Sequence, residues 1–313
     1  MNQDIEGRVL SGINSIYVVE TDRGSVVCSI KGKRLGLDGR FHNPIAAGDR
    51  VLVRQGREGG GPAQGTIVGL LERETFLARW NKRTRAPQML AANGRLLACV
   101  TSAASPPFRP RFLDRLIIAA EAGGMLPLIV LNKADLGVPA EVEDRLAIYE
   151  DLGYPLVVCS ALNGRGVDNL ARHLEPGVAV LAGHSGTGKS SLLNALDPAL
   201  DLRVGDISVK HDRGVHTTTA SVLYRLANGL QVVDTPGMRE LELTGIDPPQ
   251  LRHYYRDFAQ AALSCEYDVC LHVDEERCGV REAARSGEVH PDRYESYLRT
   301  YEQLCETARA RHE

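Results

Sequence analysis

A glycine-rich loop that ends in a lysine and a serine stands directly after the apolar run 178–181. It matches the pattern G-x-x-x-x-G-K-[ST], whose glycines let backbone N–H groups turn inward around phosphate oxygens, while the next helix adds positive charge at its N-terminus. Lys189 is expected to reach the β- and γ-phosphates, and the Ser190 hydroxyl to ligate Mg²⁺. The predicted phosphate loop comprises Gly183, His184, Ser185, Gly186, Thr187, Gly188, Lys189, Ser190 and Ser191.

Two shorter motifs predict the base that the bound nucleotide carries. The tetrapeptide Asn132-Lys133-Ala134-Asp135 follows an apolar run, and Ser160-Ala161 follows the next one. A carboxylate at Asp135 can accept both N1–H and N2–H₂ of guanine, whereas adenine lacks this donor pair and leaves the carboxylate unpaired. Lys133 can lay its alkyl stem along the purine face, and a backbone N–H at 160–161 can meet guanine O6. Each motif alone is weak, but beside the phosphate loop they predict a guanine nucleotide.

A third element, Asp234-Thr235-Pro236-Gly237, follows the apolar run 230–233. Asp234 is expected to hold Mg²⁺ through water, and the N–H of Gly237 to bond the γ-phosphate; a purely structural turn is the alternative. The base-reading residues precede the phosphate loop, the reverse of the common GTPase order, which predicts a circular permutation. The segment that senses the γ-phosphate then leads directly into the C-terminal part of the chain.

The residue after Gly237 is Met238, which cannot orient the hydrolytic water as the glutamine of many small GTPases does. The segment 210–219 stands where the first switch of a GTPase belongs. There, His216 is the candidate for positioning the water, and Thr218, or its neighbour Thr217, for ligating Mg²⁺. A solvent-exposed loop residue without a role in the chemistry is the alternative for His216.

Three cysteines and one histidine are grouped in the C-terminal part of the chain, namely Cys265, Cys270, His272 and Cys278. This ligand set suits one tetrahedral structural Zn²⁺ with no open position for chemistry, and the metal would contribute folding free energy to a region with little core. Buried cysteines without a metal are the alternative. Cys28, Cys99, Cys159 and Cys305 are isolated, and we expect them to be packing residues.

The charge is unevenly distributed along the chain. Residues 1–115 hold 18 Lys or Arg and 10 Asp or Glu, whereas the remainder holds 19 and 30. This asymmetry favours a polyanion contacted from the N-terminal side. The densest basic group combines four cations with an aromatic side chain that could stack on a base; a solvated basic linker is the alternative. Its members are Arg79, Trp80, Lys82, Arg83 and Arg85.

The elements that must position these residues differ between parts of the chain. Residues 7–72 contain β-branched runs separated by turn residues, which predicts a small β-barrel such as an OB-fold, with another small barrel or sandwich as the alternative. From residue 96, short apolar runs alternate with candidate helices near 111–122, 139–151, 166–174 and 189–196. This alternation predicts a mainly parallel sheet with helices on both faces and ligands at the carboxyl ends of the strands.

The C-terminal part is expected to hold a helix near 248–263, the Cys/His group and a polar helix from 291 to 309. We therefore expect a multidomain chain with three domains. They are an OB-fold-like, RNA-binding β-barrel at 1–74, a circularly permuted α/β P-loop GTPase domain at 75–245 and a zinc-binding helical domain at 246–313.

Composition excludes several other classes of protein. The 313 residues, 43% hydrophobic and 25% charged, are typical of a globular chain of two or three domains. No apolar run reaches the length of a transmembrane helix, and the first residues do not resemble a secretory signal. The odd number of cysteines, 7, argues against a disulfide framework. We therefore expect a cytoplasmic protein, and we expect it to be a monomer.

Taken in order, the motifs resemble those of the RsgA family, circularly permuted bacterial GTPases that depend on the small ribosomal subunit. The resemblance covers nearly the whole chain, including 293–297, and rests on N-K-A-D, G-H-S-G-T-G-K-S-S, G-V-H-T-T-T, D-T-P-G and C-x4-C-x-H-x5-C. It implies an N-terminal OB-fold, a permuted GTPase domain and a zinc domain. It also implies GTP hydrolysis stimulated by the small (30S) subunit during its late maturation, with His216 as the catalytic residue and with the rRNA as a partner.

Two other functions remain as alternatives from the residues alone. One is a GTP-sensing RNA-binding module that acts on mRNA or tRNA. The other is a small-molecule P-loop kinase, which is disfavoured because Asp135 and the two switch segments serve guanine reading and state sensing rather than a second substrate. GTP turnover alone, with small subunits and with unrelated RNA would distinguish the three.

Overall fold

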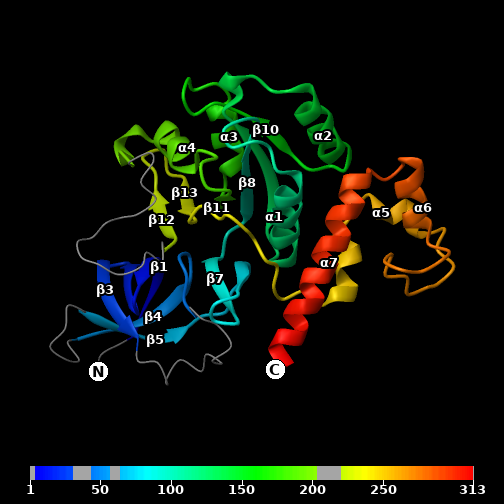
Figure 1. Cartoon of the computed structure of the whole chain (residues 1–313). Helices are drawn as coiled ribbons and strands as arrows, with labels where there is room; N and C mark the ends of the chain where they lie inside the picture. The colour runs from blue at the N-terminus through cyan, green and yellow to red at the C-terminus, as the bar shows by residue number, and fades with distance from the viewer. Residues whose placement is uncertain (1–3, 31–43, 57–63, 203–219, 313) are drawn as a thin grey trace.

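The computed structural model describes residues 4–30, 44–56, 64–202 and 220–312 (Figure 1). The N-terminal part is a five-stranded β-barrel, as expected. Its first strand pairs with both the second and the fourth, and its third pairs in parallel with its fifth, so the sheet closes on itself. Val9, Val19 and Val51 lie fully buried in its centre. The strands are β1 (Ile5–Ile13), β2 (Ile16–Thr21), β3 (Gly24–Ile30), β4 (Arg50–Gln55) and β5 (Gly65–Leu70).

The central part contains the mainly parallel sheet that the apolar runs predict. Its strand order is β10-β9-β8-β11-β13-β12, in which only β12 is antiparallel to its neighbour. Because side chains alternate along a strand, Leu97 and Cys99 of β8 face one apolar cluster while Leu96 and Ala98 face another. The strands are β8 (Leu96–Ser102), β9 (Leu126–Asn132), β10 (Leu156–Val158), β11 (Val178–Gly183), β12 (Val222–Arg225) and β13 (Gln231–Asp234).

Helices cover both faces of this sheet, and their positions agree with the predicted ones within a few residues. The side chains of α1 (Pro110–Ala122) and α2 (Ala140–Asp151) belong to one apolar cluster, and those of α3 (Val167–Leu174) and α4 (Lys189–Leu196) to the other. Pro110 occupies the first turn of α1, where its missing N–H costs no helical hydrogen bond.

The barrel and the central sheet form one continuous sheet of 11 strands, because β1 pairs with β12 at Ser11 and Val222. Side chains also connect them: the Arg8 guanidinium donates to Oε1 of the Gln231 side chain at 2.9 Å. A separate two-stranded hairpin, β6 (Phe76–Asn81) and β7 (Ala86–Ala92), follows the barrel in sequence and carries the basic cluster. The motifs did not predict this hairpin.

The C-terminal part packs against α1 through its last helix (Figure 1). The helix expected over 248–263 is instead two short ones, since Tyr255 adopts an extended conformation (φ −102°, ψ 90°) and buries its ring. A further helix was not predicted. The elements are the 3₁₀ helix η3 (Pro248–Tyr254), α5 (Phe258–Ala262), α6 (Gly279–Ser286) and α7 (Pro291–His312). None of the helices in the described ranges is long and apolar enough to cross a membrane.

Candidate nucleotide and metal sites

The phosphate loop lies at the carboxyl edge of the sheet, between the end of β11 and the start of α4. Gly186 and Gly188 have φ angles of 86° and 90°, which non-glycine residues rarely adopt. A Cβ at Gly188 would also lie 2.4 Å from Nδ2 of Asn132. The loop therefore needs glycine at this position, both for its backbone turn and for its contact with the base-reading segment.

Lys189 is held inside the loop by backbone carbonyl groups. Its ammonium donates to the carbonyl oxygens of Gly183, at 3.1 Å, and His184, at 3.3 Å. The residue is 5% exposed. Burial lowers the pKa of Lys189, and the Asp234 carboxylate opposes this effect. A bound phosphate would supply the negative charge that this buried ammonium lacks.

The base-reading motifs contact each other and the phosphate loop. The amide of Asn132 donates to the carbonyl oxygen of Thr187 at 2.9 Å and accepts from the backbone N–H of Ala161 at 3.0 Å. The Ser160 hydroxyl donates to Oδ1 of Asp135 at 2.5 Å. Three segments far apart in sequence thus meet at the carboxyl edge of the sheet, and Asn132 joins them. The sequence predicted Asn132 as a nucleotide contact and not as a link between segments.

Lys133 spans the space between these segments. Its backbone is left-handed (φ 65°), and its ammonium donates to the carbonyl oxygen of Ser105, in the loop after β8. A Cβ on Gly188 would lie 3.7 Å from Cε of Lys133, so the alkyl stem runs along the phosphate loop. This extended stem offers the flat apolar face that a purine requires.

Asp234, at the end of β13, carries an oxygen that the protein leaves without a hydrogen bond. Its Oδ1 is buried and finds no donor among the described residues. Burial raises the pKa of Asp234 to about 6, an effect that the Lys189 charge opposes. A buried carboxylate oxygen without a partner suits a hard cation or its bound water. The residues present therefore fit Mg²⁺ at this position.

The residues after Asp234 are fixed to the phosphate loop by their backbones. Met238 donates its N–H to the Gly183 carbonyl at 3.2 Å and accepts from the Ser185 N–H at 3.3 Å. Its side chain is 1% exposed, so it packs in the core and does not point to solvent. The two residues expected to complete the site, His216 and Thr218, and the alternative Thr217, lie outside the described residues.

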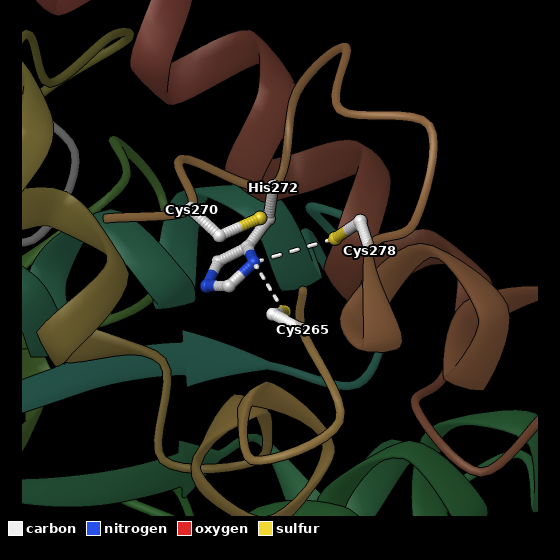
Figure 2. A group of neighbouring side chains, drawn as sticks. All are labelled: Cys265, Cys270, His272 and Cys278. Carbon is white, nitrogen blue, oxygen red and sulfur yellow. Dashed lines mark hydrogen bonds between the residues drawn. The ribbon is translucent and has the colours of Figure 1, made fainter. Parts of the chain in front are cut away.

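The four predicted metal ligands come together at the base of the C-terminal part (Figure 2). Nδ1 of His272 lies 3.6 Å from Sγ of Cys265 and 3.4 Å from Sγ of Cys278, and the four ligand atoms lie within 4.8 Å of one another. Tetrahedral zinc with ordinary bond lengths places nitrogen and sulfur ligands roughly 3.5 Å apart. The geometry and the donor set therefore both fit zinc.

Neighbouring groups orient this cluster. The Tyr294 hydroxyl donates to the His272 carbonyl at 2.8 Å, and the backbone N–H of Arg281 donates to Sγ of Cys278 at 3.4 Å. Glu275 accepts from two N–H groups of the loop. Burial raises the pKa of Cys270 to about 12, so its thiol needs a metal to become a thiolate at neutral pH. Glu275 lies inside the Cys/His motif and Tyr294 in the stretch 293–297, but neither was predicted to orient the cluster.

The basic cluster is less exposed than its sequence suggests. Trp80 is 7% exposed, so it offers no ring face on which a base could stack, and the stacking expected of it is not supported. Arg79 is half-buried and donates to Oε1 of Gln88. Lys82, Arg83 and Arg85 lie at the exposed tip of the hairpin.

Comparison with known proteins agrees with this arrangement. A family model described as RsgA GTPase matches residues 70–244. The chain is 37% identical over 311 residues to the small ribosomal subunit biogenesis GTPase RsgA of Chlorobaculum parvum, covering 98% of this chain and 100% of the relative. It is 34% identical over 316 residues to the protein of the same name from Haemophilus influenzae strain 86-028NP, covering 100% and 88%.

Solved structures extend the similarity to the whole fold. The crystal structure of YjeQ from Thermotoga maritima matches with a TM-score of 0.71 and 31% identity, over 97% of this chain and 99% of the other. The crystal structure of YloQ, described as a circularly permuted GTPase, matches with a TM-score of 0.65 and 26% identity, over 97% and 96%. The permuted order of the motifs is thus a property of this fold.

Proposed function

Because the chain belongs to the RsgA GTPase family, we propose that it hydrolyses GTP to GDP and phosphate as a late assembly factor of the small ribosomal subunit. The observation that carries this proposal is the convergence of three groups at one edge of the sheet. They are the carboxylate of Asp135, the buried ammonium of Lys189 and the unpartnered oxygen of Asp234. Each group fits a different part of a guanine nucleotide with its metal ion.

Asp135 is the residue that selects guanine. The hydrogen bond from Ser160 orients its carboxylate, which accepts N1–H and N2–H₂ of the base. Lys133 covers one face of the purine, and the backbone at Ala161 provides the N–H for O6. An adenine nucleotide would leave the carboxylate desolvated and unpaired, so the site rejects it.

The phosphates bind in the loop from Gly183 to Ser191. Lys189 is already oriented there, so binding does not have to order its long side chain. The loop N–H groups and the N-terminus of α4 contribute further positive potential. The N–H of Gly237 contacts the γ-phosphate and thereby distinguishes GTP from GDP. His216, in the first switch, positions the attacking water, since the buried Met238 cannot.

Two metal ions complete the proposed protein. Mg²⁺, when bound, neutralises charge on the β- and γ-phosphates, and Ser190, Thr218 and Asp234 are its proposed ligands. One structural Zn²⁺ would be held by Cys265, Cys270, His272 and Cys278, a set that leaves no open position for a reacting molecule. The proposed domains are the barrel at 1–74, the GTPase domain at 75–245 and the zinc domain at 246–313.

We further propose that the partner is the 30S subunit and its rRNA, and that the protein acts in the cytoplasm as a monomer. The basic hairpin tip supports an RNA contact, since Lys82, Arg83 and Arg85 expose their charges there. This contact relies on the three cations and not on Trp80.

Measuring GTP turnover alone, with purified 30S subunits and with an unrelated RNA tests the function. We expect stimulation by 30S subunits only, because a folded subunit can contact several surfaces of the protein at once. Equal stimulation by mRNA or tRNA would instead favour a GTP-sensing RNA-binding module. Hydrolysis of ATP in preference to GTP would contradict both the assembly GTPase and the GTP-sensing RNA-binding module.

A further inference from the structure

The segment that follows Gly237 is held by several elements at once. The backbone carbonyl of Leu241 accepts from the Arg115 guanidinium of α1 at 3.1 Å, and that of Glu242 accepts from the backbone N–H of Trp80 in β6 at 2.9 Å. Leu243 exchanges two hydrogen bonds with the side chain of Gln303 in α7. Residues 238–243, which we term the linking segment, therefore connect the phosphate loop with the basic hairpin and the last helix.

The linking segment also neutralises a cation of the hairpin. The ammonium of Lys82 forms an ion pair with the Glu242 carboxylate, and their side chains are 72% and 10% exposed. The hydrogen bond between the Lys82 ammonium and the Glu242 carboxylate raises the pKa of Lys82. The pair borders an open pocket of about 200 Å³, whose lining residues are Arg79, Trp80, Asn81, Lys82, Arg83, Glu240 and Glu242.

We propose that this pocket is a docking site for an RNA phosphate, that Glu242 occupies it as an internal substitute, and that GTP binding withdraws the carboxylate. The proposal rests on the proposed function, because it assumes that the protein binds rRNA. The proposal assigns a site for the RNA contact and makes that contact depend on the bound nucleotide. Lys82 is exposed enough to meet a phosphodiester as soon as Glu242 leaves, and Arg83 beside it is also exposed.

The covalent path explains how the nucleotide could act on this pair. Gly237, the residue proposed to contact the γ-phosphate, is five residues from Glu242 along a non-helical segment. Leu241 and Leu243 are buried (0% and 1% exposed), so the segment cannot absorb a displacement by exposing or rearranging its side chains at low cost. A movement of Gly237 toward the γ-phosphate is thus passed on to Glu242 and to the backbone of Trp80.

The first test uses Trp80, the single tryptophan of the chain. Its backbone N–H bonds the linking segment and the residue lines the pocket beside Glu242, so its indole fluorescence reports on the proposed movement without any RNA. In the full-length protein, a nonhydrolysable GTP analogue should shift the emission to longer wavelength and increase quenching by acrylamide, relative to GDP. Identical spectra and quenching with the two nucleotides would overturn the proposal that GTP moves the linking segment.

The second test measures affinity for purified 30S subunits. Glu242→Gln keeps the size of the side chain and the backbone hydrogen bond but removes the competing charge. It should raise the affinity of the GDP form about two- to fivefold, the range expected for an exposed ion pair, and leave the affinity with the GTP analogue unchanged. Glu240→Gln is the matched control, because Glu240 lines the same pocket without pairing to Lys82 in the described structure.

The two tests separate failure of this proposal from failure of the proposed function. Equal effects of Glu242→Gln and Glu240→Gln on the affinity would mean that only overall charge matters. That result would overturn the proposal that Glu242 substitutes for an RNA phosphate. An unchanged affinity of Glu242→Gln in the GDP form would overturn it as well. If the wild-type protein binds no 30S subunits with either nucleotide, the proposed function fails, and the Trp80 measurement still decides whether GTP moves the linking segment.

Discussion

Asp135 and Asp234 place the same side chain in two different environments at one edge of the sheet. Asp135 is oriented by the Ser160 hydroxyl and is exposed, whereas Asp234 is half-buried and its Oδ1 is buried without a hydrogen-bond donor among the described residues. The first environment favours recognition of hydrogen-bond donors, and the second favours a cation. The difference arises from burial and not from residue type.

Asp135→Asn should change the base that the protein prefers. The amide replaces one acceptor by a donor, which no longer matches guanine but can meet the 2-oxo group of xanthine. We expect GTP to bind roughly 10- to 100-fold more weakly, the loss typical of one hydrogen bond to a charged group, and xanthosine triphosphate to gain affinity. Competition with a fluorescent nucleotide measures both. Asp144→Asn, an exposed position on α2, should change neither.

His216→Ala should separate binding from hydrolysis. GTP affinity should remain near normal because the base and phosphate contacts are intact, while single-turnover phosphate release should fall on the order of 10²- to 10⁴-fold, the contribution typical of a positioned acid–base group. If turnover is unchanged, His216 has no part in the mechanism.

At the scale of elements, the C-terminal part combines the Cys/His group with apolar side chains that join the core of the central part. Phe258 and Tyr297 pack beside His272, and helix α6 begins at Cys278. The loop that holds Cys265, the loop that holds Cys270 and His272, and the start of α6 therefore depend on the same four side chains. Metal removal should consequently affect this region before the parallel sheet.

Cys270→Ser should abolish the bound zinc and lower the thermal stability of the C-terminal part. Atomic metal analysis gives the zinc content, and far-UV circular dichroism during heating gives the stability. Cys305→Ser is the control, because Cys305 in α7 lies outside the metal group, and this variant should keep one zinc per chain. Equal zinc content in the two variants would contradict the proposed ligand set.

The contact between α1 and α7 depends on a buried arginine. Arg293 (3% exposed side chain) pairs with Asp114 at 2.5 Å and with Asp257 at 2.6 Å. Arg293→Met would leave Asp257 without its cation and Asp114 with only Arg145, 4.0 Å away, so the free energy of unfolding should fall by about 3–5 kcal/mol. Arg299→Met, which breaks only an exposed pair with Glu295, should cost under about 1 kcal/mol. Urea unfolding of both variants checks the difference.

At the scale of the whole molecule, the permutation places Gly237, the proposed γ-phosphate contact, between the sheet and the C-terminal part. The barrel is joined to the same sheet through β1 and β12. The three parts are therefore connected through elements next to the nucleotide site, and α7 contacts both α1 and the linking segment. A change of nucleotide can thus reach surfaces distant from it.

Substituting Lys82, Arg83 and Arg85 together by Ala should reduce the salt dependence of 30S association. Each cation that neutralises a phosphate contributes about 0.7–0.9 to the slope of log affinity against log salt, so the slope should fall by roughly 2. Association measured from low to high KCl provides the slope. An unaltered slope would place the RNA contact elsewhere on the molecule.

The motifs alone predicted the GTPase family, a Cys/His group that could hold a metal and most of the central elements. They could do so because a phosphate loop needs glycines at fixed positions, parallel strands need apolar runs, and Pro291 marks a helix start. The β6–β7 hairpin escaped prediction, since its mostly apolar strands lack a regular alternation of polar and apolar residues, and the expected helix at 248–263 is interrupted at the buried Tyr255.

Local sequence thus determined which chemistry the chain can perform, because those requirements act between residues a few positions apart. Only the tertiary structure decided what each side chain meets. It buried Trp80, made Asn132 the link between three segments, and paired Lys82 with a carboxylate on the linking segment. Contacts between residues far apart in sequence follow from how the layers pack, and no local pattern contains that information.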